Sequence, residues 1–194
     1  NLAALEKGLG NLLKHVENMQ SVYSMPVVVA LNRFVTDTQA ELDLVAQRLR
    51  ALSVNVCLCD VWAKGGEGGM ALAEEVVRLC ETPSQPTYAY PLEETLENKI
   101  RLIAQRVYGA KDVAFAAGVK TQLRKLDALG PLPVCMAKTQ YSLSDNPKLV
   151  GRPEGFTVTV RQVRLSAGAG FVVAFTGEII AMPGLPKVPA AEAI

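Results

Sequence analysis

The sequence lacks the features that mark several common classes of protein. Its 20 Lys and Arg residues balance 19 Asp and Glu residues, which leaves a formal charge of +1. Without a basic excess to bind a phosphate backbone, we expect no nucleic-acid partner. No uninterrupted apolar run approaches the roughly 20 residues that span a bilayer, and no basic start precedes an apolar stretch as in a signal peptide. We therefore expect neither a membrane partner nor secretion.

Residues that usually ligate metals are also scarce. His15 is the only histidine, and the four cysteines (Cys57, Cys59, Cys80 and Cys135) contain a C-x-C pair instead of the C-x2-C pairs of zinc sites. We expect no metal site and interpret the cysteines as buried thiols, because cysteine in an apolar run behaves as a small hydrophobe. Reduced thiols indicate a reducing compartment, and we expect a cytoplasmic protein. The hydrophobic fraction of 49% is enough for a folded core.

The first part of the chain alternates between helical and strand patterns. Apolar residues at three- and four-residue spacing predict a helix over 2–19, and a Thr38/Glu41 capping box opens another. Short apolar runs at 27–31 and 54–59 predict strands whose two faces are both covered. A glycine loop then leads to a helix for which we expect an inward face, formed by Leu72, Val76, Leu79 and Cys80. This order predicts an α/β fold with a parallel sheet and flanking helices.

The composition changes at residues 82–86, where two prolines indicate a linker. Beyond it the patterns predict helices over 92–107 and 119–129, a long polar loop over 142–155, and strands at 133–137, 156–160, 163–165, 170–174 and 178–182. The apolar phase slips at Arg161, which indicates a bulge or a strand end. We expect a division into an α/β domain, residues 1–82, and a smaller α+β region, residues 83–194.

Two loops follow the predicted parallel strands, at the end of a sheet where α/β folds place ligand contacts. Residues 32–37 contain Phe34, which either stays exposed or folds back on the following helix. Residues 60–69 contain Trp62, the only tryptophan, and a run of glycines that would let backbone N–H groups approach a ligand. This run lacks the Lys-Ser or Lys-Thr of a phosphate-binding P-loop. Ligand binding and a flexible connector both remain open for it.

Three other features of the sequence have simpler explanations than a functional site. The small residues at 164–171, together with the prolines at 182–186, favour tight turns. Lys138 and Thr139 follow a predicted strand and could reach an anion, although a solvated lysine is the commoner case. His15 has no visible catalytic partner in the sequence.

Several strings resemble the formate–tetrahydrofolate ligase family over effectively the whole chain. They are VVVALNRFVTDT (27–38), DVWAKGGEGG (60–69), VYGAKDV (107–113), PVCMAKTQYSLSDNP (133–147) and RLSAGAGFVVAFTGEIIAMPGLPKVPAA (164–191). These strings are most similar to those of the monofunctional bacterial form. The resemblance implies the carboxy-terminal part of a longer enzyme, which fits a chain that starts at Asn1 inside a predicted helix.

The resemblance also implies a chemistry. Family members use ATP and Mg²⁺ to make formyl phosphate from formate, and N10 of tetrahydrofolate then attacks it to give 10-formyltetrahydrofolate. A monovalent cation (K⁺ or NH₄⁺) activates them, they are homotetramers, and their sheet is P-loop-NTPase-like. The phosphate loop belongs to the amino-terminal part, so we expect this piece alone to have no ligase activity.

The family's binding residues carry over position by position. Phe34 and Trp62 match the two aromatic residues that sandwich the pterin ring. The adenine side of the nucleotide site is matched by Asn32, Ala63, Lys64, Gly65 and Gly66, with Glu67 and Gly68 as an extension. Val35 stands where many members have proline. Catalytic residues are not identified.

Two alternatives to this reading remain. The chain could be a non-catalytic α/β module that binds a nucleotide or a partner chain. The segment after Pro86 could instead serve mainly as a scaffold for oligomerisation.

Overall fold

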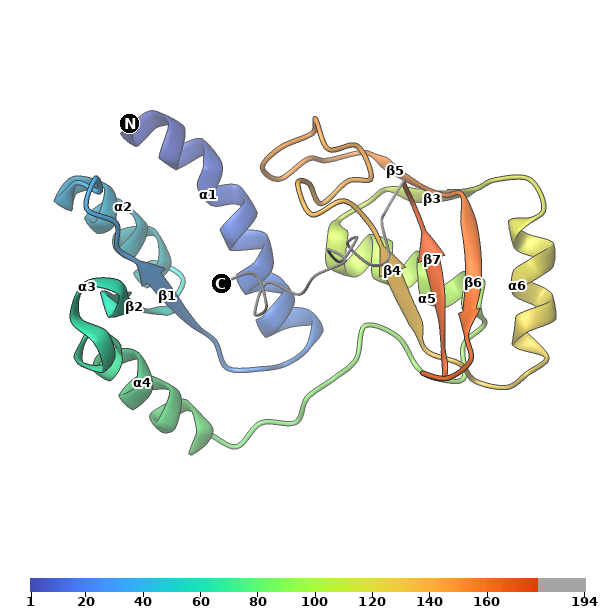
Figure 1. Ribbon diagram of the computed structural model, residues 1–194, viewed down its shortest axis with the longest axis horizontal. Helices are drawn as coiled ribbons and strands as arrows, with labels where there is room; N and C mark the ends of the chain where they lie inside the picture. The colour runs from blue at the N-terminus through green and yellow to red at the C-terminus, as the bar shows by residue number, and fades with distance from the viewer. Residues whose placement is uncertain (178–194) are drawn as a thin grey trace, which may run out of the picture.

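The computed structural model describes residues 1–177 and shows an α/β fold arranged in two lobes (Figure 1). Small sheets with flanking helices form both lobes; the sheet of the first lobe is parallel, as the sequence predicts, and the second lobe contains both parallel and antiparallel strand pairs. Residues 81–95 connect the lobes without a helix or strand. The strand predicted at 178–182 and the prolines at 182–186 lie outside the described residues. Among residues 1–177, no helix combines the length and the apolar character needed to cross a membrane.

The first lobe follows the predicted order of elements. In chain order these are α1 (Leu2–Glu17), the π-helical turn η1 (Asn18–Val22), β1 (Val28–Asn32), α2 (Gln39–Arg50), β2 (Asn55–Cys59), α3 (Val61–Lys64), the 3-10 turn η2 (Gly65–Gly69) and α4 (Met70–Cys80). The strands β1 and β2 pair in parallel. The capping box predicted at the start of α2 is present, with the Thr38 side chain and the Glu41 side chain in their reciprocal contacts.

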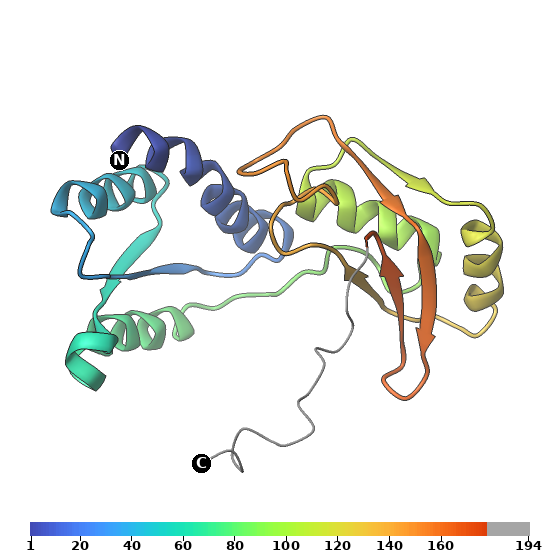
Figure 2. The ribbon, with the colours of Figure 1, turned by 45° about the horizontal axis from the view of Figure 1, so that its top comes forward.

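The core of this lobe lies on one side of its sheet. In Figure 2 the helices α1 and α2 lie above β1 and β2, and α4 lies below them. The buried residues of this core are Leu9, Val16, Val45, Leu49 and Val54. Burial of these side chains stabilises the lobe by about 1.5–3 kcal/mol for each large apolar residue relative to exposure.

The other side of the sheet is poorly covered, and two predictions are wrong here. The helix α4 has no buried residue: Val76 and Cys80 are exposed, and Leu72 and Leu79 are only half-buried. Leu58 in β2 is also exposed, so the strands are not covered on both faces. The physical reason is the width of the sheet, because two strands offer a helix too little surface to bury a whole face.

The second lobe contains more strand than we predicted. Its elements are α5 (Leu96–Leu102), the π-helical turn η3 (Ile103–Tyr108), β3 (Asp112–Phe115), α6 (Val119–Asp127), β4 (Val134–Ala137), β5 (Thr157–Val160), β6 (Gln162–Ser166) and β7 (Phe171–Phe175). One sheet pairs β3 with β5 in parallel, and another has the order β4-β7-β6. The strand β3 has no counterpart in our prediction, and the predicted helix begins at Leu96 instead of Leu92.

The predicted strand end at Arg161 is confirmed. Val160 ends β5, and Gln162 opens β6 in the other sheet, where β6 and β7 form an antiparallel hairpin. The Arg161 N–H donates to the Phe175 carbonyl at 2.8 Å, so the crossing residue itself is bonded to β7. Val158, Val160 and Val163 are fully buried on either side of this crossing. The slip of the apolar phase therefore marks the point where the chain changes sheets.

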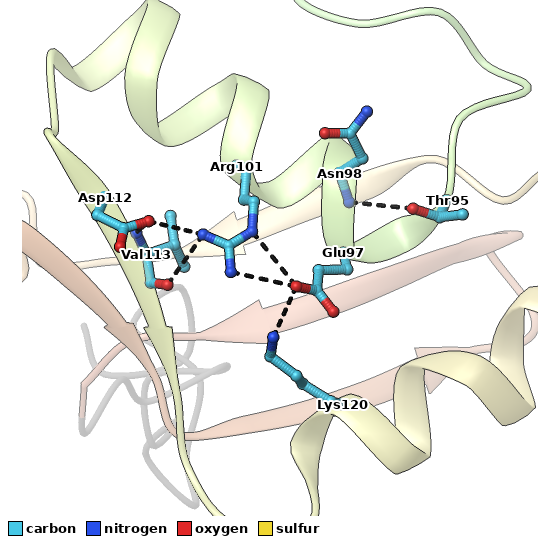
Figure 3. Close-up of polar contacts among 7 residues, drawn as sticks. All are labelled: Thr95, Glu97, Asn98, Arg101, Asp112, Val113 and Lys120. Atoms are coloured by element: carbon cyan, nitrogen blue, oxygen red, sulfur yellow. Dashed lines mark hydrogen bonds and ion pairs between the residues drawn. The ribbon is translucent and has the colours of Figure 1, made fainter.

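A polar cluster ties α5, β3 and α6 together at the surface of the second lobe (Figure 3). The Arg101 guanidinium pairs with Glu97 at 3.1 Å and with Asp112 at 2.7 Å, and it donates to the Val113 carbonyl. Lys120 of α6 reaches the same Glu97 carboxylate at 2.9 Å. These two cations hold the pKa of Glu97 below its usual value, although partial burial opposes the shift.

The lobes also contact each other directly through α1 and η1. Asn11 donates to the Gly151 carbonyl at 3.0 Å, and Arg152 pairs with Glu17 at 2.6 Å. Asn18 is buried and donates to the Val107 carbonyl at 2.8 Å. A small apolar cluster of Val22, Ala89 and Ile103 packs at the seam. Helix α1 therefore belongs to the core of the first lobe and docks on the second.

Candidate functional site

The two loops singled out in the sequence start side by side. Asn32, the last residue of β1, is the register partner of Cys59, the last residue of β2. The next N–H along β1, that of Arg33, donates to the Cys59 carbonyl at 3.0 Å and extends the pairing by one bond. Parallel strands end at one edge of a sheet, so the loops that carry Phe34 and Trp62 leave from the same edge.

A tight turn presents Phe34. The Asp37 N–H donates to the Phe34 carbonyl at 3.1 Å, and the Asp37 carboxylate accepts the Phe34 N–H at 2.8 Å. These reciprocal bonds close residues 34–37, and Phe34 is left 67% exposed. The sequence left open whether Phe34 stays exposed or folds back on the following helix; the structure shows the exposed ring. Sequence reasoning missed the role of Asp37, which an aspartate in a short turn could have signalled.

Trp62 lies on the short helix α3 and is 87% exposed. The Asp60 carbonyl accepts the N–H groups of Ala63 at 3.2 Å and Lys64 at 3.0 Å, so Asp60 opens this helical turn. The Asp60 carboxylate also pairs with the Lys64 ammonium at 3.3 Å. Burying an indole is strongly favourable in water, so an exposed tryptophan on an ordered turn indicates a surface with a partner to bind.

The glycine run, which the sequence analysis describes as a loop, is wound into a helical turn. Gly65, Gly66, Glu67 and Gly68 belong to the 3-10 turn η2, which leads straight into α4. The Asp60 N–H donates to the Gly68 carbonyl at 3.0 Å, which brings the two backbones into contact. Gly65 has a φ of +58°, a conformation that favours glycine. The glycines thus fix the position of Trp62 instead of serving as a flexible connector.

The remaining residues predicted for this site are brought to the same edge but are not enclosed. Asn32, Ala63, Lys64 and Glu67 are all exposed to solvent. Within residues 1–177, no group of three or more His, Cys, Asp or Glu side chains is placed to hold a metal ion. The described part of the site therefore offers two aromatic faces, the Asn32 amide, the Lys64 ammonium, the Glu67 carboxylate and backbone groups.

The four cysteines of the chain are not the buried thiols we predicted. Cys57 and Cys59 are half-buried, Cys80 and Cys135 are exposed, and all four are free. Burial raises the pKa of the Cys57 thiol, and the Glu75 carboxylate raises it further. The narrow sheet is again the reason for Cys57 and Cys59, because their strand is only partly covered.

Other candidate residues lie away from this edge. His15 is exposed on α1. Residues 166–171 form the turn between β6 and β7, which confirms the structural role predicted for them. Lys138 is half-buried, and its ammonium donates to backbone carbonyls, so it is not the freely solvated lysine considered from the sequence. A cavity of about 580 Å³ lies in the seam between the lobes and is lined by tyrosines and apolar residues, among them Tyr23, Tyr90 and Tyr108.

Comparison with known protein families gives a match over the full length of the sequence. The family model described as formate–tetrahydrofolate ligase matches residues 1–194, which is the whole chain.

Proposed function

The chain belongs to the formate–tetrahydrofolate ligase family, and from this premise we propose that the edge at the ends of β1 and β2 is the pterin-stacking wall of the ligase. Phe34 and Trp62 supply the two aromatic faces, and the pterin ring of tetrahydrofolate slots between them. The observation that carries the proposal is the exposure of both rings on loops that leave from paired strand ends. Stacking an aromatic ring contributes about 0.5–1.5 kcal/mol beyond the burial of area.

We propose that the adenine of ATP binds beside this wall. The residues for it are Asn32, Ala63, Lys64, Gly65, Gly66, Glu67 and Gly68. The support is their position on the terminus of β1 and on α3 and η2, next to Phe34 and Trp62 in the chain. The ordered backbone of η2 would present this surface without a large loss of conformational entropy on binding.

The reaction proposed for the complete site has two steps. Formate attacks the γ-phosphate of ATP to give formyl phosphate and ADP, and N10 of tetrahydrofolate then attacks the formyl carbon and releases phosphate. The wall would hold N10 in position and help to exclude water from the labile intermediate. The sequence contains no P-loop pattern, so we propose that phosphate binding, magnesium and the monovalent cation involve chain beyond these 194 residues. This piece alone would then lack ligase activity.

The remaining parts of the proposal rest on the sequence and on its resemblance to the family. They are a cytoplasmic location, a homotetrameric assembly of the complete enzyme, and a P-loop-NTPase-like parent sheet that β1 and β2 would extend. We also propose a domain boundary near residue 82, with the α/β domain over 1–82 and a smaller α+β domain over 83–194. The separate apolar cores of the two lobes support that boundary.

The test uses Trp62 as the only tryptophan of the 194-residue chain. Titration with tetrahydrofolate should quench the tryptophan emission saturably, after correction for absorbance by the ligand. Phe34→Ala should raise Kd by about 2- to 13-fold, which corresponds to the loss of about 0.5–1.5 kcal/mol. Tyr88→Ala, which removes an exposed aromatic ring outside the site, should leave Kd unchanged.

Unchanged emission, or quenching that survives Phe34→Ala with the same Kd, contradicts the stacking wall. If the isolated chain binds too weakly, the same titration is made after the amino-terminal part is restored. Formate-dependent ADP release should appear only in that restored protein. A folded complex that binds both substrates without ADP release contradicts the proposed reaction and favours a non-catalytic binding module.

A further inference from the structure

The side chain of Lys138 is turned back onto its own loop. Lys138 directly follows β4, and its ammonium donates to the backbone carbonyls of Thr139 at 2.8 Å and Ser144 at 3.2 Å. The Ser142 carbonyl also accepts from this ammonium. Three carbonyls of one loop therefore converge on a single cationic centre, which is an arrangement of oxygen atoms that proteins use to coordinate monovalent cations.

An aromatic face completes the surroundings of the ammonium. The Nζ atom of Lys138 lies 5.2 Å from the centroid of the Tyr108 ring, within the range of a cation–π contact. No carboxylate pairs directly with Lys138 in the structure of residues 1–177. Burial lowers the pKa of Lys138, and the nearby Asp145 carboxylate opposes that shift. The charge is thus met by carbonyl dipoles and a ring, as in a site for a simple cation.

The same carbonyls hold together residues 139–152, the loop of the second lobe that contacts α1. Ser142 and Ser144 are buried, and the Ser144 N–H donates to the Ser142 hydroxyl at 2.9 Å. Further along the loop, Gly151 accepts from Asn11 and Arg152 pairs with Glu17, both on α1. An ordered loop is required for these contacts, because residues 139–152 contain no helix or strand to position them.

We propose that the carbonyls of Thr139, Ser142 and Ser144 form a monovalent-cation site whose resident cation is the ammonium of Lys138. Its occupation orders residues 139–152 against α1 and so fixes the seam between the lobes. This inference concerns the architecture of the chain and does not depend on the proposed ligase activity. Without the lysine, the carbonyls should accept an external cation of similar size, such as ammonium or potassium.

The experiment compares the 194-residue chain with Lys138→Ala, which empties the site, and with Lys148→Ala as a matched control. Lys148 is exposed on the same loop. Lys138→Ala should lower the Tm, and ammonium or potassium chloride should restore part of the loss saturably, since a ligand that binds only the folded state stabilises it. Tetramethylammonium chloride at the same ionic strength should not. The parent chain and Lys148→Ala should respond equally to all three salts.

A second readout reports on the loop itself. Trypsin cleaves after Lys148 only when the loop opens, and the absence of this cut in Lys148→Ala identifies the fragment. Cleavage should be several-fold faster in Lys138→Ala and should slow again in ammonium. Lys138→Met should open the loop without rescue, because its side chain still fills the site, and it serves as the test if the alanine variant does not fold. Equal cleavage in the parent and in folded Lys138 variants, or equal effects of ammonium and tetramethylammonium, overturns the inference.

Discussion

The backbone carbonyl of Asp60 lies against Gly68 so closely that a Cβ atom on residue 68 would stand 2.3 Å from the carbonyl oxygen. This contact packs the turn η2 back onto the start of α3. The Asp60 N–H donates to the Gly68 carbonyl, and the Asp60 carbonyl accepts from the N–H groups of Ala63 and Lys64. Asp60 is thus bonded both to η2 and to the first turn of α3. The placement of the turn that carries Trp62 therefore depends on a glycine six residues away.

Gly68→Ala should destabilise the first lobe by about 1–3 kcal/mol, because the added methyl group meets backbone that cannot rotate away. Urea unfolding measures this loss, and the tryptophan emission of the native state should shift because Trp62 moves. Gly66→Ala is the matched control, since a Cβ there meets nothing within 4 Å. A Gly68→Ala protein as stable as Gly66→Ala contradicts this account of the turn.

Glu75 should make the link between α4 and β2 sensitive to acid. Its carboxylate pairs with Arg78 and accepts from Asn55 of β2, and these bonds lower its pKa to about 2. A carboxyl with a lowered pKa contributes stability above its ordinary value of 4.5 and loses that contribution as the pH falls towards 2. Glu75→Gln should therefore lower the Tm at pH 7 and flatten its decline between pH 4.5 and 2. Glu74→Gln, at an exposed neighbouring position, should leave the decline unchanged.

The cluster in Figure 3 should depend more on Arg101 than on Lys120. Arg101 bridges Glu97, Asp112 and the Val113 carbonyl, and its guanidinium lies 5.2 Å from the Phe115 ring. Arg101→Ala should cost about 1–2 kcal/mol of unfolding free energy, whereas Lys120→Ala should cost less than about 1 kcal/mol. Urea unfolding at low and high salt separates the two, because screening weakens exposed ion pairs. Equal losses from the two substitutions would show that Arg101 has no bridging role.

The sequence was informative where the signal is local. The capping box at Thr38 and Glu41 and the strand ending near Cys59 depend on residues close in the chain, and both were predicted correctly. The side-by-side start of the Phe34 and Trp62 loops followed from the rule for parallel strands. Strand pairing between residues far apart in the chain could not be predicted from local patterns. β3 is short and is stabilised by β5, whose residues pair with those of β3 from about 45 positions further along the chain.

The prediction that α4 has a buried inward face was wrong for a related reason. Its apolar spacing correctly predicted a helix, but periodicity does not say how much sheet lies beneath that helix. Val76 and Leu72 are exposed or half-buried because the sheet is narrow, and that width depends on which strands pair.

Val35→Pro should stiffen the turn that presents Phe34. Residues 34–37 form a turn closed by the bond from the Asp37 N–H to the Phe34 carbonyl, and Val35 occupies its second position, where proline is favoured. The Val35 N–H makes no hydrogen bond within the described residues, so proline removes none there. We expect a gain of about 0.4–1 kcal/mol in stability, since proline restricts the unfolded chain. Tetrahydrofolate should quench Trp62 at a modestly lower concentration, because less loop entropy is lost on binding. Thr36→Pro, at the third position of the same turn, should destabilise the protein instead, and a Val35→Pro protein that behaves like Thr36→Pro would contradict the turn assigned to Phe34.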